Sequence, residues 1–137
     1  MDFKLNKQEK LTSRTAVERL FNEGHSVMAF PLRAVFRLRE PGETPVKFMI
    51  TIPKKRIRKA VMRVTLRRRV RESYRLSRRS LLHGSLQQCD VGVDIAFIYL
   101  DSMPAPYSVL DTKMTQLLTR ISQAATEYRD HSIKNPV

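Results

Sequence analysis

One segment constrains the fold of this chain more than any other. Residues 54–79 read KKRIRKAVMRVTLRRRVRESYRLSRR and hold thirteen of the chain's twenty-six lysines and arginines, with one acid, Glu72. Small and apolar side chains recur at helical spacing, at Met62, Leu66, Val70, Ser73, Ser77 and Leu81. At 3.6 residues per turn these form a single stripe. The pattern predicts a helix from about Ile57 to Leu82, with Gly84 just past its end.

The charge of the chain is concentrated in this helix. The formal net charge is +13, of which residues 54–79 carry +12 and the other 111 residues carry +1. An ordinary solvated helix face mixes signs, whereas Arg67 and Arg71 here place like charges four residues apart and destabilise the helix. Such a surface is typical of proteins that bind a polyanion, and phosphate backbones are the commonest polyanions.

Length and composition exclude several classes of protein. With 137 residues, of which 42% are hydrophobic, the chain predicts one domain with one core. There is no apolar run long enough for a transmembrane helix, and the first ten residues lack the apolar stretch of a signal peptide. Cys89 is the only cysteine, so no internal disulfide forms, and we expect a cytoplasmic protein. The three histidines, His25, His83 and His131, show no metal-ligand spacing.

Two further helices are predicted from apolar spacing. The first runs from about Ser13 to Glu23, with Ser13 as N-cap. Gly24 follows at the helix C-terminus, where a residue that tolerates positive φ is favoured. The last runs from about 108 to 127, with Leu110, Met114, Leu117, Leu118, Ile121 and Ala125 facing inward. Residues 1–12 are expected to be a mobile basic lead-in, and residues 128–137 a tail.

Three strands are predicted from alternation. Residues 31–39 and 46–52 each alternate apolar with polar or basic side chains, and the EPGET turn between them indicates an antiparallel hairpin. Residues 90–100 are apolar on both sides, which favours a central strand. The predicted order is α-β-β-α-β-α in a single domain, residues 13–127, of the α+β class. We expect a two-layer α-β sandwich.

Motifs that carry enzymatic chemistry are missing. The four glycines form no phosphate-binding loop, and there is no Gly-x-Ser-x-Gly or His-Glu-x-x-His motif. Asp90, Asp94 and Asp101 lie on or beside a strand and are interpreted as strand-end and surface acids. We therefore predict no catalytic residue and no metal ligand in this chain.

Nucleic acid is the favoured partner. Arginine binds phosphate bidentately and remains charged, so the cationic helix is suited to structured RNA. The basic strand face, which includes Arg33, Arg37 and Lys47, offers a second, shallow platform. Phe21 is interpreted either as a stacking surface for a single strand or as a core residue.

The segment from Pro53 to Arg75 resembles bacterial ribonuclease P protein subunits. That family has a Ser-Lys-Lys strand end, a Lys-Ala-Val helix start, an Arg-Asn-Arg motif, and then Lys-Arg and Arg-Glu. The chain matches in register at Lys54, Lys55, Lys59, Ala60, Val61, Arg63, Arg68, Arg71 and Glu72. RLFNEG (19–24) and DIAFIY (94–99) resemble further family segments, so the resemblance spans about residues 9–125. Val64 and Thr65 stand where the family has Asn and Arg.

The resemblance implies a ribonuclease P protein-like fold and an accessory role. In that family the protein binds a catalytic RNA and the 5′ leader of precursor tRNA, while the RNA, with Mg²⁺ held mainly on it, removes the leader. The catalytic RNA would contact Lys54, Lys55, Arg58, Lys59, Arg63, Arg67, Arg68, Arg71 and Arg75. A leader cleft between the sheet and the first helix would be lined by Val17, Phe21, Arg33, Val35, Lys47 and Thr51. No membrane or DNA partner is expected.

Two other functions remain open from the residues alone. The first is a structural RNA-binding protein, such as a ribosomal component, because a basic helix does not name its RNA. The second is an electrostatic binder of membranes or acidic proteins. The charged side of the predicted helix has few large apolar anchors, which argues against membrane insertion.

Overall fold

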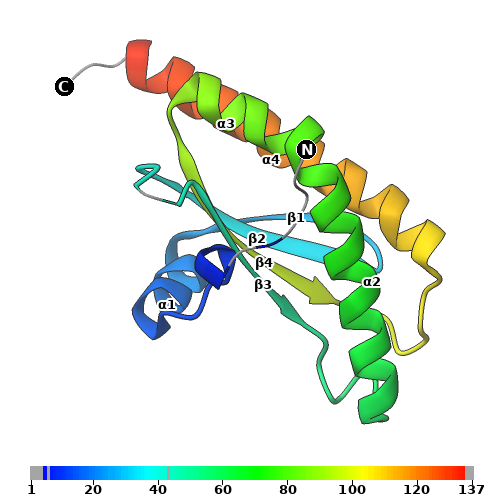
Figure 1. Ribbon diagram of the computed structural model, residues 1–137. Helices are drawn as coiled ribbons and strands as arrows, with labels where there is room; N and C mark the ends of the chain where they lie inside the picture. Colours follow the sequence, from blue (N-terminus) through cyan, green and yellow to red (C-terminus); the bar gives the residue numbers. More distant parts are fainter. Residues whose placement is uncertain (1–4, 6, 43, 135–137) are drawn as a thin grey trace.

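The computed structural model describes residue 5, residues 7–42 and residues 44–134. The described chain forms a sheet of four strands with helices on both of its faces (Figure 1). The strands are β1 (His25–Ala29), β2 (Leu32–Arg39), β3 (Val46–Thr51) and β4 (Gly92–Tyr99). The helical elements are η1 (Lys7–Glu9), α1 (Arg14–Glu23), α2 (Ala60–Arg78), η2 (Arg79–His83), α3 (Gly84–Cys89) and α4 (Tyr107–Lys134).

The strand order in the sheet is β1-β2-β4-β3. Strand β4 pairs antiparallel with β2 and parallel with β3, so the predicted hairpin between residues 31–39 and 46–52 is wrong. The predicted central position of β4 is confirmed, because β4 is almost entirely buried on both faces. A strand that is apolar on both faces is favoured in the centre of a sheet, where both faces are buried. Strand β4 occupies that position, between β2 and β3. Strand β1, which we did not predict, pairs antiparallel with β2.

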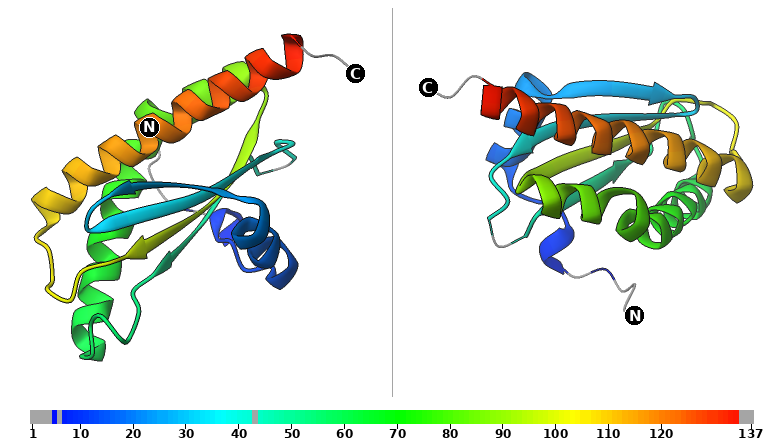
Figure 2. Two further views of the ribbon diagram at one scale, coloured as in Figure 1. Left: turned by 180° about the vertical axis from the view of Figure 1, so that it is seen from behind. Right: turned by 90° about the horizontal axis from the view of Figure 1, so that it is seen from above.

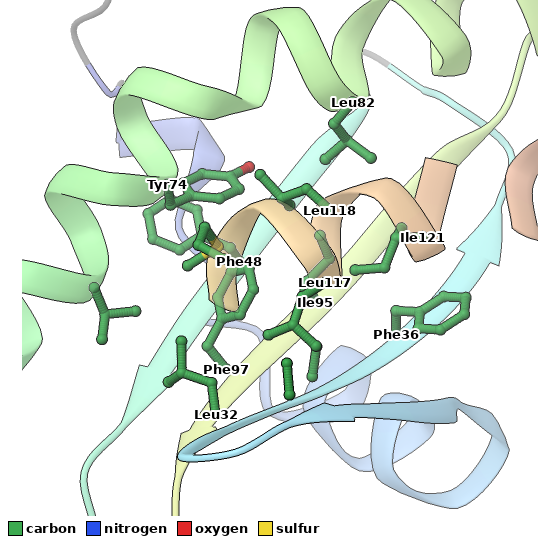
Figure 3. Packing of buried hydrophobic residues seen from close by; sticks show 14 of the residues in the cluster. Leu32, Phe36, Phe48, Tyr74, Leu82, Ile95, Phe97, Leu117, Leu118 and Ile121 are labelled. Atoms are coloured by element: carbon green, nitrogen blue, oxygen red, sulfur yellow. The ribbon is translucent and has the colours of Figure 1, made fainter. Parts of the chain in front are cut away.

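Helices α2 and α4 cover one face of the sheet (Figures 1 and 2). Tyr74 of α2 packs at tilted angles against Phe48 of β3 and Phe97 of β4, with ring centroids 4.5 and 5.5 Å away (Figure 3). Leu117, Leu118 and Ile121 of α4 are completely buried beside them. The predicted apolar stripes of both helices thus form the main core, and the α+β class is confirmed. The sheet and these two helices are its two main layers.

Helix α1 packs on the opposite face of the sheet, where Leu20 forms a small cluster with Leu11, Val35 and Ala96. Ser13 is the N-cap as predicted, and its Oγ accepts a hydrogen bond from the Ala16 amide at 3.4 Å. Gly24 ends the helix for a reason other than the predicted one. Its φ is −78°, but a Cβ there would lie 2.3 Å from the Leu20 carbonyl oxygen.

The helix after β3 continues further than predicted. Helix α2 leads into a π-helical turn, η2, and then into α3, which ends at Asp90 with a left-handed φ of 54°. Gly84, the predicted terminator, has ordinary helical angles. The turn keeps apolar side chains directed at the core, because Leu82 and Leu86 are both buried. A π-turn inserts one residue into the helical repeat, which a 3.6-residue periodicity cannot anticipate.

Both ends of the domain are more ordered than predicted. In the described part of the lead-in, Leu11 is buried and donates its amide to the Phe48 carbonyl at 2.8 Å, along the β3 edge. Glu9 is buried as well. Residues 1–4 and 6 lie outside the described residues. Helix α4 continues to Lys134, seven residues beyond its predicted end at about Glu127, and residues 135–137 lie outside the described part.

Candidate RNA-binding surface

The basic segment divides into exposed cations and cations used by the fold. Eight lysines and arginines of residues 54–79 are exposed, and their side chains have no ion-pair or hydrogen-bond partner within the described chain: Lys54, Lys55, Arg56, Arg58, Lys59, Arg67, Arg68 and Arg71. Five of them precede α2, whose first turns lie beyond the end of β3 (Figure 1). The other three occupy the outer side of the helix. Arg56, which our site prediction omitted, belongs to the same exposed group.

Two arginines of the segment, Arg63 and Arg69, donate hydrogen bonds to carbonyl oxygens of neighbouring loops. Arg63 donates to the carbonyl oxygens of Ile57 and Arg58 at 3.0 and 2.8 Å and so ties down the loop before α2. Arg69 donates to the Ala105 carbonyl at 2.7 Å. Arg63 was predicted to contact RNA. The structure shows that this half-buried residue also stabilises the loop before α2. A charge count of the sequence could not distinguish such residues from free ones.

Arg75 and Glu72 form a two-point ion pair on the surface of α2. Arg75 Nε and Nη2 lie 3.1 and 2.6 Å from the two carboxylate oxygens of Glu72. The hydrogen bond from Arg75 lowers the pKa of the Glu72 carboxyl and keeps it ionised. The single acid of the segment therefore neutralises Arg75, a predicted RNA contact, and leaves the charge of Arg68 and Arg71 unpaired.

Arg78 lies in the interior and not among the exposed cations of the segment. Its side chain is 4% exposed, and Nη1 lies 2.9 Å from the carboxylate of Glu9 in η1. A buried guanidinium is stable only with a closely matched anion. The N-terminal segment provides that anion, so the ion pair ties η1 to the end of α2.

The other face of the sheet carries the predicted leader-cleft residues, but it does not bring them all together. Arg33, Ile98 and Thr51 form one row across β2, β4 and β3, while Arg37, Asp94 and Lys47 form another, four residues along each strand. Helix α1 covers the row between them, where Val35 is buried. Lys47 therefore lies in a different part of this face from Arg33 and Thr51.

Val17 and Phe21 lie on the flank of α1 that faces the row of Arg33. Val17 is half-buried and packs against the same small cluster as Ile98, while Phe21 is 47% exposed. Both are two residues from Arg19, and two helical residues differ by about 200° in direction, so Arg19 lies on the opposite flank. Phe21 is thus an exposed aromatic beside the open sheet face and not a core residue.

The described part of the chain offers neither a metal site nor a membrane span. No group of three or more His, Cys, Asp and Glu side chains gathers there in an arrangement that could hold a metal ion. Among the described helices, none combines the length and the apolar character that crossing a membrane requires.

Comparisons with known proteins decide the family. The ribonuclease P family profile matches residues 5–122 of this chain. This chain belongs to the ribonuclease P protein family. A ribonuclease P protein component from Porphyromonas gingivalis is 34% identical over 121 residues, which are 88% of each chain. The resemblance seen at the basic helix therefore extends over nearly the whole domain.

Solved structures of ribonuclease P proteins share the fold. The protein from Thermotoga maritima covers 82% of this chain and 96% of its own length, with a TM-score of 0.64 and 25% identity. The Staphylococcus aureus protein matches with the same TM-score at 16% identity, over 82% of this chain and 94% of its own, and supports the fold alone. Within this family, Val64 and Thr65 remain the departures from the expected motif. Val64 is 46% exposed on α2, beside a 79% exposed Val61.

Proposed function

We propose that this chain is the protein subunit of a ribonuclease P ribonucleoprotein and assists removal of the 5′ leader from precursor tRNA. Family membership supports this role most directly. The observation that carries the proposal to particular residues is the group of eight exposed, unpaired cations within the described residues of the segment 54–71. Each can neutralise a phosphate and release counterions.

The catalytic RNA is the partner proposed for this group. Lys54, Lys55, Arg58 and Lys59 precede α2, and Arg67, Arg68 and Arg71 continue along its outer side. Such a rigid row suits a folded RNA, whose phosphates are fixed in space. If six or more phosphates are contacted, the logarithm of the binding constant falls with the logarithm of salt concentration with a slope of about −5 or steeper.

The 5′ leader is assigned to the flank of α1 that carries Phe21. Exposed Phe21 offers a stacking surface, and Arg33 and Thr51 offer a cation and a hydroxyl on the neighbouring row of the sheet. Lys47 lies apart from this flank. We propose that hydrolysis belongs to the RNA, with Mg²⁺ held mainly by RNA phosphates, and that the ribonucleoprotein acts in the cytoplasm.

Cleavage of precursor tRNA at low magnesium tests the proposal. The cognate catalytic RNA is assayed with and without the protein, and we expect efficient cleavage only with it, because the protein's cations replace part of the screening that magnesium supplies. Absence of stimulation by a folded protein that still binds RNA would instead indicate a structural RNA-binding protein. RNA that co-purifies with the protein from cells separates these functions, since ribosomal RNA supports only the second.

The double variant Arg67→Gln/Arg68→Gln tests the assigned helix. Both side chains are exposed and have no partner within the described chain, so the variant should fold normally but bind the catalytic RNA about tenfold or more weakly. Arg14→Gln is the matched control, because Arg14 is exposed, lies outside the surface and pairs only with Glu18. Equal affinity of the two variants would count against the assignment.

A further inference from the structure

A hollow of about 600 Å³ lies on the flank of α1 away from Phe21. It lies between the first turns of α1, the loop after β2 and the row of the sheet that holds Arg37, Asp94 and Lys47. Ser13, Thr15 and Arg19 line it from α1. We refer to it as the α1 hollow. Its size is within the range of sites that hold small molecules or single nucleotides.

Two arginines that line the α1 hollow, Arg37 and Arg39, are already paired with carboxylates. Asp94 is buried and lies 2.8 Å from Arg39 Nε, and this arginine also donates to the carbonyl oxygens of Glu40, Pro41 and Thr44 in the loop. Glu23, at the end of α1, lies 3.1 Å from Arg37 Nε. Both carboxylates therefore hold arginines in place and leave the remaining cations unmatched.

Arg19 and Lys47 provide the unmatched charge. Neither side chain has an ion-pair or hydrogen-bond partner among the residues that the structure describes. Lys47 is half-buried on β3, in the same row of the sheet as Arg37 and Asp94. Among the described residues that line the hollow, four are cations, Arg19, Arg37, Arg39 and Lys47, and one is an acid, Asp94. Since Asp94 is paired with Arg39 and Glu23 with Arg37, two positive charges of this described lining remain unmatched in a concave site. A concave site focuses this field on a ligand of opposite charge.

We propose that the α1 hollow is a phosphate-binding site that takes one phosphate-bearing nucleotide of a bound RNA. Arg19 and Lys47 would bind the phosphate, with Arg37 as a flanking cation, and the hydroxyls of Ser13 and Thr15 would accept or donate to the sugar. The choice of RNA as the source of the phosphate rests on the proposed function. The site lies on the opposite flank of α1 from Phe21, so RNA bound there contacts the protein on both sides of this helix.

The salt dependence of RNA binding tests this site. We would measure binding of wild type and Arg19→Gln/Lys47→Gln to the cognate catalytic RNA and, separately, to precursor tRNA with its 5′ leader. Loss of this phosphate contact should reduce the slope by about 0.7–0.9 for one of these RNAs and weaken its binding about fivefold or more near 0.1 M salt. Thermal unfolding followed by circular dichroism checks that the variant is folded, and Arg14→Gln is again the matched control.

The outcomes separate this inference from the proposed function. If the hollow variant binds both RNAs with the slope and affinity of Arg14→Gln, while Arg67→Gln/Arg68→Gln is impaired, the inference is overturned and the proposed function stands. If neither double variant is impaired, both fail. In a third arm, inorganic phosphate is titrated into the ¹⁵N-labelled protein. Shifts at Thr15, Arg19 and Lys47 without any effect of the variant on RNA binding would overturn the assignment to RNA.

Discussion

Two residues that the charge pattern alone would place on the surface, Glu9 and Arg78, form the most buried ion pair of the described chain. Their side chains are 11% and 4% exposed, and 2.9 Å separates Arg78 Nη1 from the Glu9 carboxylate. Removing one partner leaves a buried, uncompensated charge, whereas an exposed pair such as Arg14 with Glu18 is screened by water. The contribution of an ion pair to the stability of this molecule therefore depends on how deeply the pair is buried.

Glu9→Ala is expected to reduce the free energy of unfolding by about 3–5 kcal/mol, because Arg78 is then buried without an anion. Glu18→Ala, which removes the same group from an exposed pair, should cost less than about 1 kcal/mol. Urea denaturation of the three proteins measures both values. A loss at Glu9 as small as that at Glu18 would show that Arg78 is adequately solvated or paired without it.

His83 should make stability depend on pH. Burial, together with nearby Arg78, lowers the pKa of His83 below its ordinary value of 6.5. The unfolded chain therefore takes up the proton first as pH falls, and protonation favours unfolding. The stabilisation is fully present above pH 6.5 and is lost as the pH falls from there toward the lowered pKa.

We expect the free energy of unfolding to fall more between pH 7.5 and pH 5.5 in the wild type than in His83→Gln. His25→Gln is the matched control, because His25 is exposed at the start of β1. Urea denaturation at the two pH values gives each difference. The same pH dependence in the wild type and in His83→Gln would contradict the assignment.

At the scale of the element, α2 combines a buried stripe, an internal arginine set and an exposed cationic side. Val64 and Thr65 interrupt that side, since Val64 is exposed and the Thr65 hydroxyl donates to the Val61 carbonyl of its own helix at 3.1 Å. Neither side chain contributes charge where the family motif has an asparagine and an arginine. We therefore expect RNA binding by α2 to depend more heavily on the cations around Arg68.

The variant Val64→Asn/Thr65→Arg should bind the catalytic RNA more tightly, because one more arginine joins the exposed side of α2. The slope of the binding constant against salt should steepen by about 1 if the new arginine reaches a phosphate. Thr65→Gln is the uncharged control, of similar helix propensity and length. An unchanged slope in the double variant would mean that the RNA does not approach this part of the helix.

The sequence predicted most elements of this fold but not how they pair. The apolar stripe of α2 and the two-sided burial of β4 are strong local patterns, and both are confirmed. Strand β1 has only five residues and keeps Met28 exposed, so its alternation is weak. The pairing of β3 with β4 depends on contacts across more than forty residues, and the EPGET turn favoured a nearer partner that the sheet does not use.

The candidate site divides in the same way. The cationic segment was evident from charge alone, and Arg67, Arg68 and Arg71 are exposed in the fold. The internal contacts of Arg63 and Arg78 were not predictable, because their partners lie in loops and in the N-terminal segment. Arg19 was not among the predicted site residues. Its helical position, opposite Val17 on α1, could have indicated a cation on the other flank of this helix. Whether the assigned residues contact RNA stays a prediction.

At the scale of the whole molecule, the placement of β4 affects how the protein is made. Strand β4 lies between β2 and β3, yet it follows both in the chain, after all of α2. While the ribosome is still synthesising α2, the edges of β2 and β3 that β4 will occupy have no partner strand and remain open to other chains. The nascent chain at that moment already carries its most cationic segment, and mutual repulsion between such chains opposes their association until Gly92–Tyr99 emerges and closes the sheet.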